Sequence, residues 1–163
     1  MSADFWIEKL KLEKHPEGGA FREIYRSPVK AGLPMSDGAI SNRNLSTGIY
    51  YLLQAGEFSA FHRIRSDEIW HHYDGGDLMI YVLHPDIGLE IKYLGKNHPD
   101  AELQLCVPGG LWFASRPAPQ TSFALCGCTV SPGFDFADFE LANAESLIAD
   151  FPEFDSVIVE LTL

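Results

Sequence analysis

The chain has 163 residues, of which 46% are hydrophobic and 21% charged, a composition that fits one globular domain with a buried core and excludes a disordered chain. Its formal net charge of -11 repels phosphate backbones and anionic lipid headgroups, so we expect neither nucleic acid nor a membrane as a partner. No apolar run approaches the roughly 20 residues that span a bilayer.

The first predicted element is a short helix. Ser2 is a suitable N-cap, and the apolar residues after it recur at helical spacing: Ala3, Trp6, Ile7 and Leu10. The helix should end before His15, which we expect at the surface beside a proline. Glu17 could reach the mouth of a barrel, but a turn residue is the simpler interpretation, because two glycines follow it. Residues 20–26 favour a strand.

A long loop and a series of short strands follow. Residues 27–44 contain two Pro, two Gly and few large apolar side chains, which favours a loop. From there, β-branched and aromatic residues gather between Gly- and Pro-containing turns. We expect strands at 45–54, 57–64, 68–73, 77–84, 88–94, 102–107, 111–115 and 121–130. Such evenly spaced short strands predict an all-β barrel or jelly roll.

The C-terminal part should add a turn, a short helix capped by Asn143, and a last strand over SVIVELTL, residues 156–163. No internal repeat or linker interrupts the sequence, so we interpret residues 1–163 as one domain.

Several candidate functional residues lie in the stretch GEFSAFHRIRSDEIWHHYDGG, residues 56–76. Gly56, His62, Glu68 and Gly75 stand at the spacing of the first signature motif of the cupin superfamily, which this stretch resembles. Ile64 occupies the place of that motif's second His. Pro108-Gly109-Gly110 resembles the second cupin motif, with Phe113 in the place of its His.

The match is closer to one branch, the cupin 5 (DUF985) family, whose members are often labelled predicted sugar epimerases. The segments that carry this resemblance run along nearly the whole chain: HPEGGAFREIYRS, TGIYYLL, FHRIRSDEIWHHYDG, VPGGLWFAS and GCTVSPGFDFADFEL. The resemblance implies a double-stranded β-helix, that is, a cupin or jelly-roll barrel with a short N-terminal and a short C-terminal helix. It also implies pairing into a homodimer.

A metal site is one hypothesis for this stretch. Cupin metal sites use three His and one Glu, and only His62 and Glu68 remain at those positions, while Ile64 and Phe113 offer no lone pair. His71 or His72 could substitute. Strand alternation from Glu68 places His72 on the Glu68 face and His71 on the other, unless a bulge exchanges them. We therefore predict no metal and no other cofactor, and keep a cupin with an altered ligand set as the third hypothesis.

Metal-free acid–base chemistry is the leading hypothesis. The sugar epimerases that share this barrel use a His base, an acid that orients it and a Tyr acid opposite. By that resemblance His62 would be the general base, Glu68 the orienting or second acid, and Tyr50 the opposing acid, with Tyr51 and Tyr25 as alternatives.

A protein that binds a sugar-like molecule without catalysis is the second hypothesis, because aromatic side chains at a barrel mouth suit such ligands. The ligand-binding candidates for either function are Ser59, Trp70, His71, His72, Gln104, Trp112 and Arg22. An arginine would be needed for a nucleotide-sugar diphosphate, and Arg63 and Arg65 are also available. A buried pair of His62 and Glu68 that only stabilises the barrel remains an alternative.

Three sparse cysteines and a start, MSADFWIEKL, without the features of a signal peptide lead us to expect a cytoplasmic protein with reduced thiols. The expected partner is a small molecule.

Overall fold

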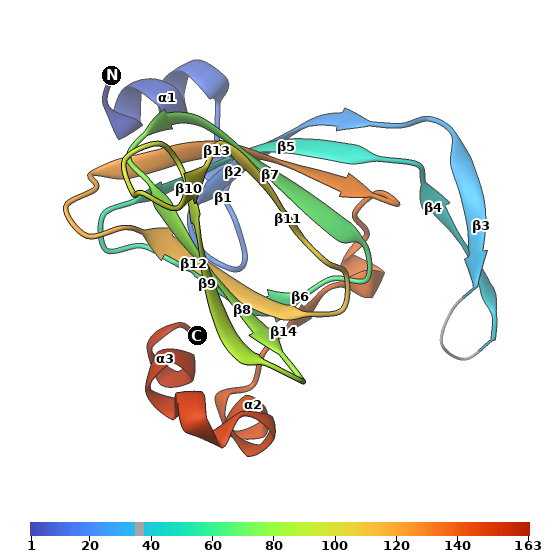
Figure 1. The fold of residues 1–163 in the computed structure, drawn as a ribbon. Coiled ribbons are helices and arrows are strands. Elements are labelled where there is room, and N and C mark those ends of the chain that lie inside the picture. Colours follow the sequence, from blue (N-terminus) through green and yellow to red (C-terminus); the bar gives the residue numbers. More distant parts are fainter. Residues whose placement is uncertain (35–37) are drawn as a thin grey trace.

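Two six-stranded sheets face each other and form the jelly-roll barrel that the sequence predicts (Figure 1). The computed structural model describes residues 1–34 and 38–163. The first sheet has the order β1 (Glu13–Lys14), β2 (Ala20–Arg26), β5 (Thr47–Gln54), β13 (Phe123–Ser131), β7 (Asp67–Gly75) and β11 (Gln104–Val107). The second has the order β10 (Ala101–Glu102), β9 (Gly88–Leu94), β8 (Leu78–His84), β12 (Trp112–Pro117), β6 (Ser59–Arg63) and β14 (Glu140–Leu141).

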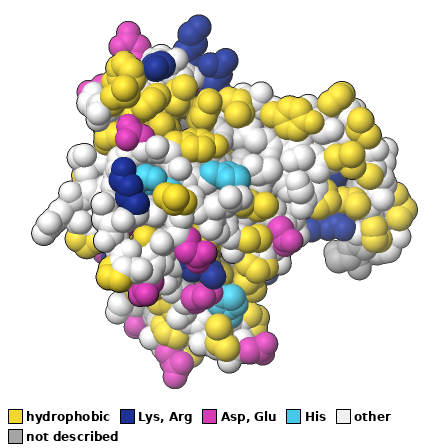
Figure 2. Space-filling view, turned by 45° about the horizontal axis from the view of Figure 1, so that its top comes forward, with side chains coloured by type: hydrophobic (Ala, Val, Ile, Leu, Met, Phe, Trp, Pro, Cys, Tyr) yellow, Lys and Arg dark blue, Asp and Glu magenta, His cyan; other side chains and the backbone are white. Residues whose placement is uncertain are grey.

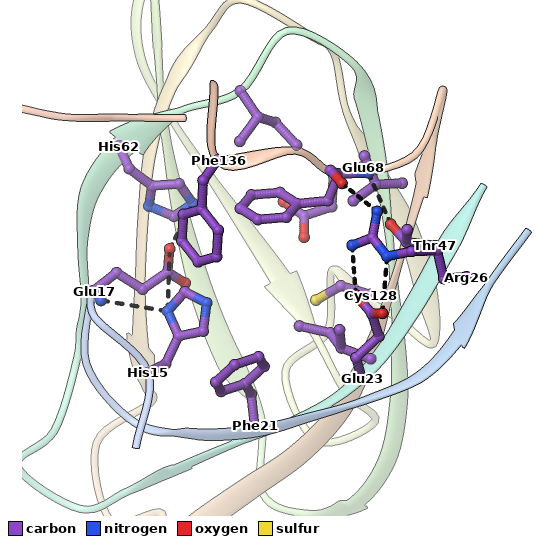
Figure 3. A pocket seen from close by; sticks show the side chains of 14 residues that line it. His15, Glu17, Phe21, Glu23, Arg26, Thr47, His62, Glu68, Cys128 and Phe136 are labelled. Carbon is purple, nitrogen blue, oxygen red and sulfur yellow. Dashed lines mark hydrogen bonds and ion pairs between the residues drawn. The ribbon is translucent and has the colours of Figure 1, made fainter. Parts of the chain in front are cut away.

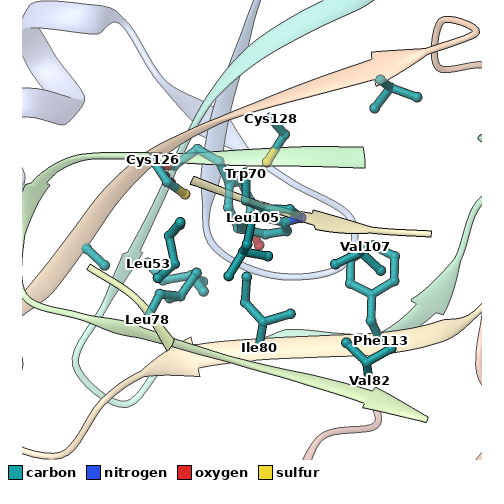
Figure 4. Packing of buried hydrophobic residues seen from close by; sticks show 14 of the residues in the cluster. Leu53, Trp70, Leu78, Ile80, Val82, Leu105, Val107, Phe113, Cys126 and Cys128 are labelled. Atoms are coloured by element: carbon teal, nitrogen blue, oxygen red, sulfur yellow. Dashed lines mark hydrogen bonds between the residues drawn. The ribbon is translucent and has the colours of Figure 1, made fainter. Parts of the chain in front are cut away.

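The main core lies between the sheets, where alternate residues of the strands point inward (Figure 4). Its buried side chains include Leu53, Trp70, Leu78, Ile80, Val82 and Phe113. This packing fixes which side of each strand faces the barrel interior.

Helices cover the outer faces of both sheets. Helix α1 (Ala3–Leu10) begins at Ser2, whose hydroxyl accepts a hydrogen bond from the Phe5 N–H, and packs on the first sheet over Leu52 and Leu125. Helices α2 (Ala144–Asp150) and α3 (Asp155–Glu160) pack on the second sheet. Two 3-10 turns, η1 (Phe136–Asp138) and η2 (Pro152–Phe154), complete this region. None of the helices in the described part of the chain is long and apolar enough to cross a membrane.

Most predicted elements are confirmed, including α1, β2, the strands between residues 45 and 130, and the helix that Asn143 caps. The predicted last strand is wrong, because residues 155–160 form α3. Ile158 and Leu161 are three residues apart and both buried, while Val159 is exposed, which is the pattern of a helix that packs along one side.

The predicted loop at 27–44 is also wrong in most of its length. Strands β3 (Lys30–Pro34) and β4 (Ile40–Asn44) form an antiparallel two-stranded arm that extends away from the barrel, and residues 35–37 lie outside the described part (Figure 1). Apolar side chains are spread along this arm in Figure 2, and Val29 and Ile40 are among the exposed ones.

The turn between β1 and β2 lies tightly against the barrel. Gly18 has φ +115°, and a Cβ there would come within 2.0 Å of the Phe58 carbonyl oxygen, so only glycine fits. The Ala60 N–H donates to the Glu17 carbonyl (2.8 Å), and the Tyr51 hydroxyl donates to the Gly18 carbonyl (2.6 Å). These contacts hold Glu17 next to β6.

Replacing Gly18 by Ala should therefore destabilise the protein by about 2 to 3 kcal/mol, because the methyl group meets backbone atoms as well as an unfavourable φ. Urea unfolding would measure the loss. Gly56→Ala is the matched control, since Gly56 has φ +83° but open space around its Cβ position, and it should lose only about 1 kcal/mol. Equal losses in the two variants would contradict the close approach.

Candidate functional site

One end of the barrel encloses a cavity between β2, β5, β6, β7 and β13 (Figure 3). It leaves about 90 Å³ for the centres of water-sized molecules, which is room for several waters or for a small organic molecule in their place. Its walls are largely apolar, formed by Phe21, Ile49, Ile64, Val130, Phe134 and Phe136. Its polar lining consists of His15, Glu17, Glu23, Arg26, Thr47, His62, Glu68 and Cys128.

His62 on β6 is 3% exposed and held at both ring nitrogens. Nδ1 lies 2.7 Å from the Ala60 carbonyl oxygen. A carbonyl only accepts hydrogen bonds, so Nδ1 carries a proton and Nε2 is the basic atom. Nε2 lies 3.2 Å from Oε2 of Glu17. Burial lowers the pKa of His62, which favours the neutral ring.

Glu17 is 6% exposed and is the carboxyl closest to His62. The Ser59 hydroxyl donates to its Oε1 at 2.8 Å. Burial raises the pKa of Glu17, although nearby His15, Ser59 and Tyr51 act in the opposite direction. Because Nδ1 of His62 already donates to Ala60, Nε2 and Glu17 form a hydrogen bond only when the pair holds one further proton. That proton makes either a neutral acid–imidazole pair or an ion pair, and burial favours the neutral form on both sides.

His15 completes this wall of the cavity (Figure 3). Its Nδ1 accepts a hydrogen bond from the Glu17 backbone N–H at 3.3 Å, so in the neutral ring the proton lies on Nε2. Burial lowers the pKa of His15. The ring packs edge-on against Phe21 at 4.5 Å between centroids. His15 therefore presents an N–H donor rather than a positive charge.

Glu68 on β7 lies across the cavity from this wall (Figure 3). It is 7% exposed, and burial raises its pKa to about 7. Its polar neighbours are the Cys128 thiol, a weak donor, and the Trp70 indole. The Trp70 indole lowers the pKa of Glu68. The geometry is not that of a hydrogen bond, and Trp70 Nε1 has no hydrogen-bond partner among the described residues. Glu68 is thus a carboxyl that can donate or accept a proton near neutral pH.

The structure brings together three of the sequence-predicted residues, His62, Glu68 and Ser59, the last through its bond to Glu17. Trp70 lies behind Glu68 in the core. The expectation that Glu68 would orient His62 needs correction, because Glu17 makes that contact. The surface expectation for His15 is wrong, because its side chain is buried. Glu17 lies in the predicted turn, but its side chain also enters the barrel, because the chain turns at Gly18 against Phe58.

Tyr50 points away from the cavity. It packs on the outer side of the first sheet, with α1 and with Tyr73 at 5.9 Å between ring centroids. Its neighbour Tyr51 faces inward, as strand alternation requires, and lies beside Glu17. Of the tyrosines we considered as the acid, Tyr51 is therefore the one near the site.

The remaining ligand-binding candidates also lie outside the cavity. His71 faces outward, as alternation predicts, with Nε2 3.1 Å from the Thr129 hydroxyl. His72 Nε2 lies 3.2 Å from the Gly76 carbonyl oxygen, next to a register shift between β7 and β13. Gln104 is exposed on β11. Trp112 lies beneath the Arg63 guanidinium at 4.4 Å, and Arg22 donates to the Leu10 carbonyl at 3.1 Å.

The chain is similar to known proteins in both sequence and fold. The family model described as Cupin superfamily (DUF985) matches residues 4–142 of this chain. The chain therefore belongs to this cupin family. A protein of Leishmania major, described as hypothetical, has a TM-score of 0.90 and 32% identity to this cupin, covering 99% of each chain. Protein SO0799 of Shewanella oneidensis has a TM-score of 0.88 and 40% identity, covering 100% of this chain and 98% of that chain.

A curated relative, the uncharacterized protein YML079W of Saccharomyces cerevisiae, is 33% identical over 150 residues, which is 85% of this chain and 74% of the yeast protein. Oxalate decarboxylase of Bacillus subtilis has a TM-score of 0.54 at 17% identity, covering 91% of this chain and 36% of that enzyme. At that identity the likeness concerns the jelly-roll fold and not the reaction.

A cupin-type metal does not fit the side chains of this site. Ile64 lines the cavity with a hydrocarbon side chain, and Phe113 packs against the His62 ring at 4.2 Å between centroids. Neither offers a donor atom. Within residues 1–34 and 38–163, no group of three or more His, Cys, Asp or Glu side chains is arranged to hold a metal ion.

The buried carboxyl of Glu68 makes stability depend on pH. Its folded pKa of about 7 lies above its ordinary value of 4.5, so its contribution to stability is present at low pH and is lost as pH rises through this range. Glu68→Gln should therefore gain about 2 to 3 kcal/mol relative to the wild type between pH 5 and pH 8. Urea unfolding at both pH values tests this. Glu145→Gln, on the exposed side of α2, is the matched control and should show no such change. A constant difference between Glu68→Gln and wild type would rule out a raised pKa.

Proposed function

We propose that this cupin catalyses the metal-independent isomerisation or epimerisation of a small sugar-like molecule, with His62 as the general base. The observation that carries the proposal is the buried contact between His62 Nε2 and the Glu17 carboxyl at 3.2 Å, inside a cavity that a small molecule can enter. A base must be oriented and have its conjugate acid stabilised, and this pair provides both.

The first chemical step would remove a proton from the carbon next to a carbonyl group. His62 Nε2 takes this proton in the state in which Glu17 is ionised and no proton lies between the two groups, and the imidazolium that forms lies beside the Glu17 carboxylate. The Ala60 carbonyl keeps the ring in place through Nδ1 at 2.7 Å. The apolar parts of the wall lower the local polarity, which strengthens the attraction between imidazolium and carboxylate.

The second proton-transfer group in the proposal is Glu68, on the opposite wall. In its protonated form it gives a proton to the substrate's carbonyl oxygen as the C–H proton leaves, producing an enediol. For the isomer, His62 returns its proton to the former carbonyl carbon while Glu68 removes the proton of the neighbouring hydroxyl group, which becomes the new carbonyl. For the epimer, a proton from solvent is added to the other face of the original carbon, Glu68 takes back the proton of the enediol oxygen, and His62 releases its proton to solvent. A pKa of about 7 suits a group that must both donate and accept.

Proton exchange with solvent tests this function. The purified protein would be incubated with a panel of neutral aldoses and ketoses in D2O, and deuterium at the carbon next to the carbonyl measured by NMR. We expect exchange in at least one substrate, reduced at least about a hundredfold in His62→Asn and Glu17→Gln. His71→Asn, a histidine on the outer side of the sheet, is the control and should keep full activity.

Non-catalytic binding of a sugar-like molecule is the second candidate. The observation in its favour is the apolar surface that six side chains, three of them phenylalanines, give to the cavity wall. Saturable binding without deuterium exchange for any sugar in the panel would support this candidate and contradict the catalytic proposal.

A further inference from the structure

We propose that the ligand of this cavity carries an ammonium group that pairs with Glu68, so that the substrate class is an amino-substituted, sugar-sized molecule rather than a neutral or phosphorylated sugar. The inference rests on the proposed function in taking this cavity as the substrate site. It changes the role of Glu68 in that reaction: a carboxylate paired with an ammonium group stays ionised, so for this substrate class the proton for the carbonyl oxygen comes from water in the cavity.

Glu68 is the first reason. Its side chain is more than nine-tenths buried, lines the cavity, and has no cationic partner among the described residues (Figure 3). A buried carboxylate without a counter-charge is unfavourable, and a ligand cation would remove that cost by forming a charge-assisted hydrogen bond. The immediate polar neighbours of the carboxyl, Cys128 and Trp70, are neutral. The two titratable groups that act on the pKa of Glu68 are His62, which lowers it, and Glu17, which raises it.

The other cations of the cavity are already engaged. Arg26, at the rim, donates to both carboxylate oxygens of Glu23, at 2.9 and 2.6 Å, and further to the Asn44 side chain and the Phe134 carbonyl. This matched pair leaves no net positive charge. The two histidines lie against Glu17 on the opposite wall. The lining therefore holds three carboxyl groups and one arginine, and its potential favours a cation.

No arginine is placed to receive a phosphate or carboxylate ligand. Arg22 donates to the Leu10 carbonyl, and Arg63 pairs with Glu140 and stacks on Trp112, both outside the cavity. Arg65 also does not line it. In the described lining the one arginine is paired with Glu23 and there is no lysine, so an anionic ligand would lack a permanent counter-charge.

The aromatic walls are the third reason. Phe21, Phe134 and Phe136 all line the cavity, and Figure 3 shows Phe21 and Phe136 on the side of the histidines. Phe21 and Phe136 therefore face a ligand from the side opposite Glu68, where they suit its hydrocarbon parts while the ammonium group lies at Glu68.

Three polyols that differ only at one carbon test the proposal: D-glucamine with an ammonium group, D-sorbitol with a hydroxyl group and D-gluconate with a carboxylate. Binding to the wild type at pH 7.5 would be measured by calorimetry, with NMR competition for weak affinities. We expect D-glucamine to bind at least tenfold more tightly than D-sorbitol, and D-gluconate not to bind. An equal or stronger affinity for either of the others, or no binding of D-glucamine at 20 mM, overturns the proposal.

Two variants test whether Glu68 causes the preference for D-glucamine over D-sorbitol. Glu68→Gln should bring the affinities for D-glucamine and D-sorbitol to within about twofold of each other, because the amide keeps the shape and removes the charge. Glu145→Gln is the matched control and should keep the full preference. If Glu68→Gln keeps the preference, another group binds the ammonium and the proposal fails.

The pH dependence in the wild type needs no variant. D-glucamine stays protonated from pH 5.5 to pH 8, whereas Glu68 loses its proton over this range. The affinity should therefore rise roughly tenfold or more with pH, and a constant or falling affinity contradicts a carboxylate–ammonium pair.

The two proposals fail separately. Deuterium exchange into a neutral sugar without any preference for D-glucamine would support the proposed reaction and overturn the ammonium ligand. A preference for D-glucamine that depends on Glu68, without exchange in any sugar, would do the reverse.

Discussion

The site depends on one interaction, the burial of the Glu17 carboxyl against His62 and Ser59. A carboxyl group enters a protein interior at a high cost in solvation unless hydrogen bonds replace its water. Here the Ser59 hydroxyl takes one oxygen and His62 Nε2 faces the other. The backbone adds its own constraint, since the Glu17 carbonyl accepts from Ala60 and Gly18 lies against Phe58. The N-terminal turn and β6 are thus joined by polar contacts on both backbone and side chain, which fixes the His62 ring without a metal.

Two substitutions in the cupin motifs fit this arrangement. In a metal-binding cupin the ligand histidines are oriented by the ion that they share. In this chain Phe113 packs on the His62 ring at 4.2 Å, and Ile64 contributes to the cavity wall. The positions that elsewhere hold donor atoms have become hydrophobic surface beside the remaining histidine. Hydrophobic neighbours lower the local polarity, and this is why burial is the largest influence on the pKa values of His62, Glu17 and Glu68.

The sequence was sufficient for the barrel and for the first motif, because strand periodicity and motif spacing are local patterns. It could not reveal the role of Glu17, which depends on a contact with β6 some forty residues away along the chain. The choice of Tyr50 over Tyr51 failed for a related reason. The segment IYYLL, residues 49–53, is hydrophobic at every position because α1 covers the outer side of β5, so alternation cannot tell which tyrosine faces inward. The strand prediction for residues 156–163 was wrong because a short run of β-branched residues is compatible with a strand or with a helix. Only the surface against which it packs decides between the two.

Burial acts in opposite directions on the acids and bases of this cavity, raising the pKa of Glu17 and Glu68 and lowering that of His15 and His62. Both shifts favour the uncharged forms of these side chains in the empty site. A charged ligand or a transferred proton favours their charged forms instead. Since much of the wall is apolar, each such charge must be balanced by a side chain within the cavity. Glu17 can balance a proton on His62, and Glu68, on the far wall, is left to balance the ligand. This division of roles follows from the placement of two carboxyls on opposite walls, and it links the proposed base to the proposed ammonium site through the same physical cause.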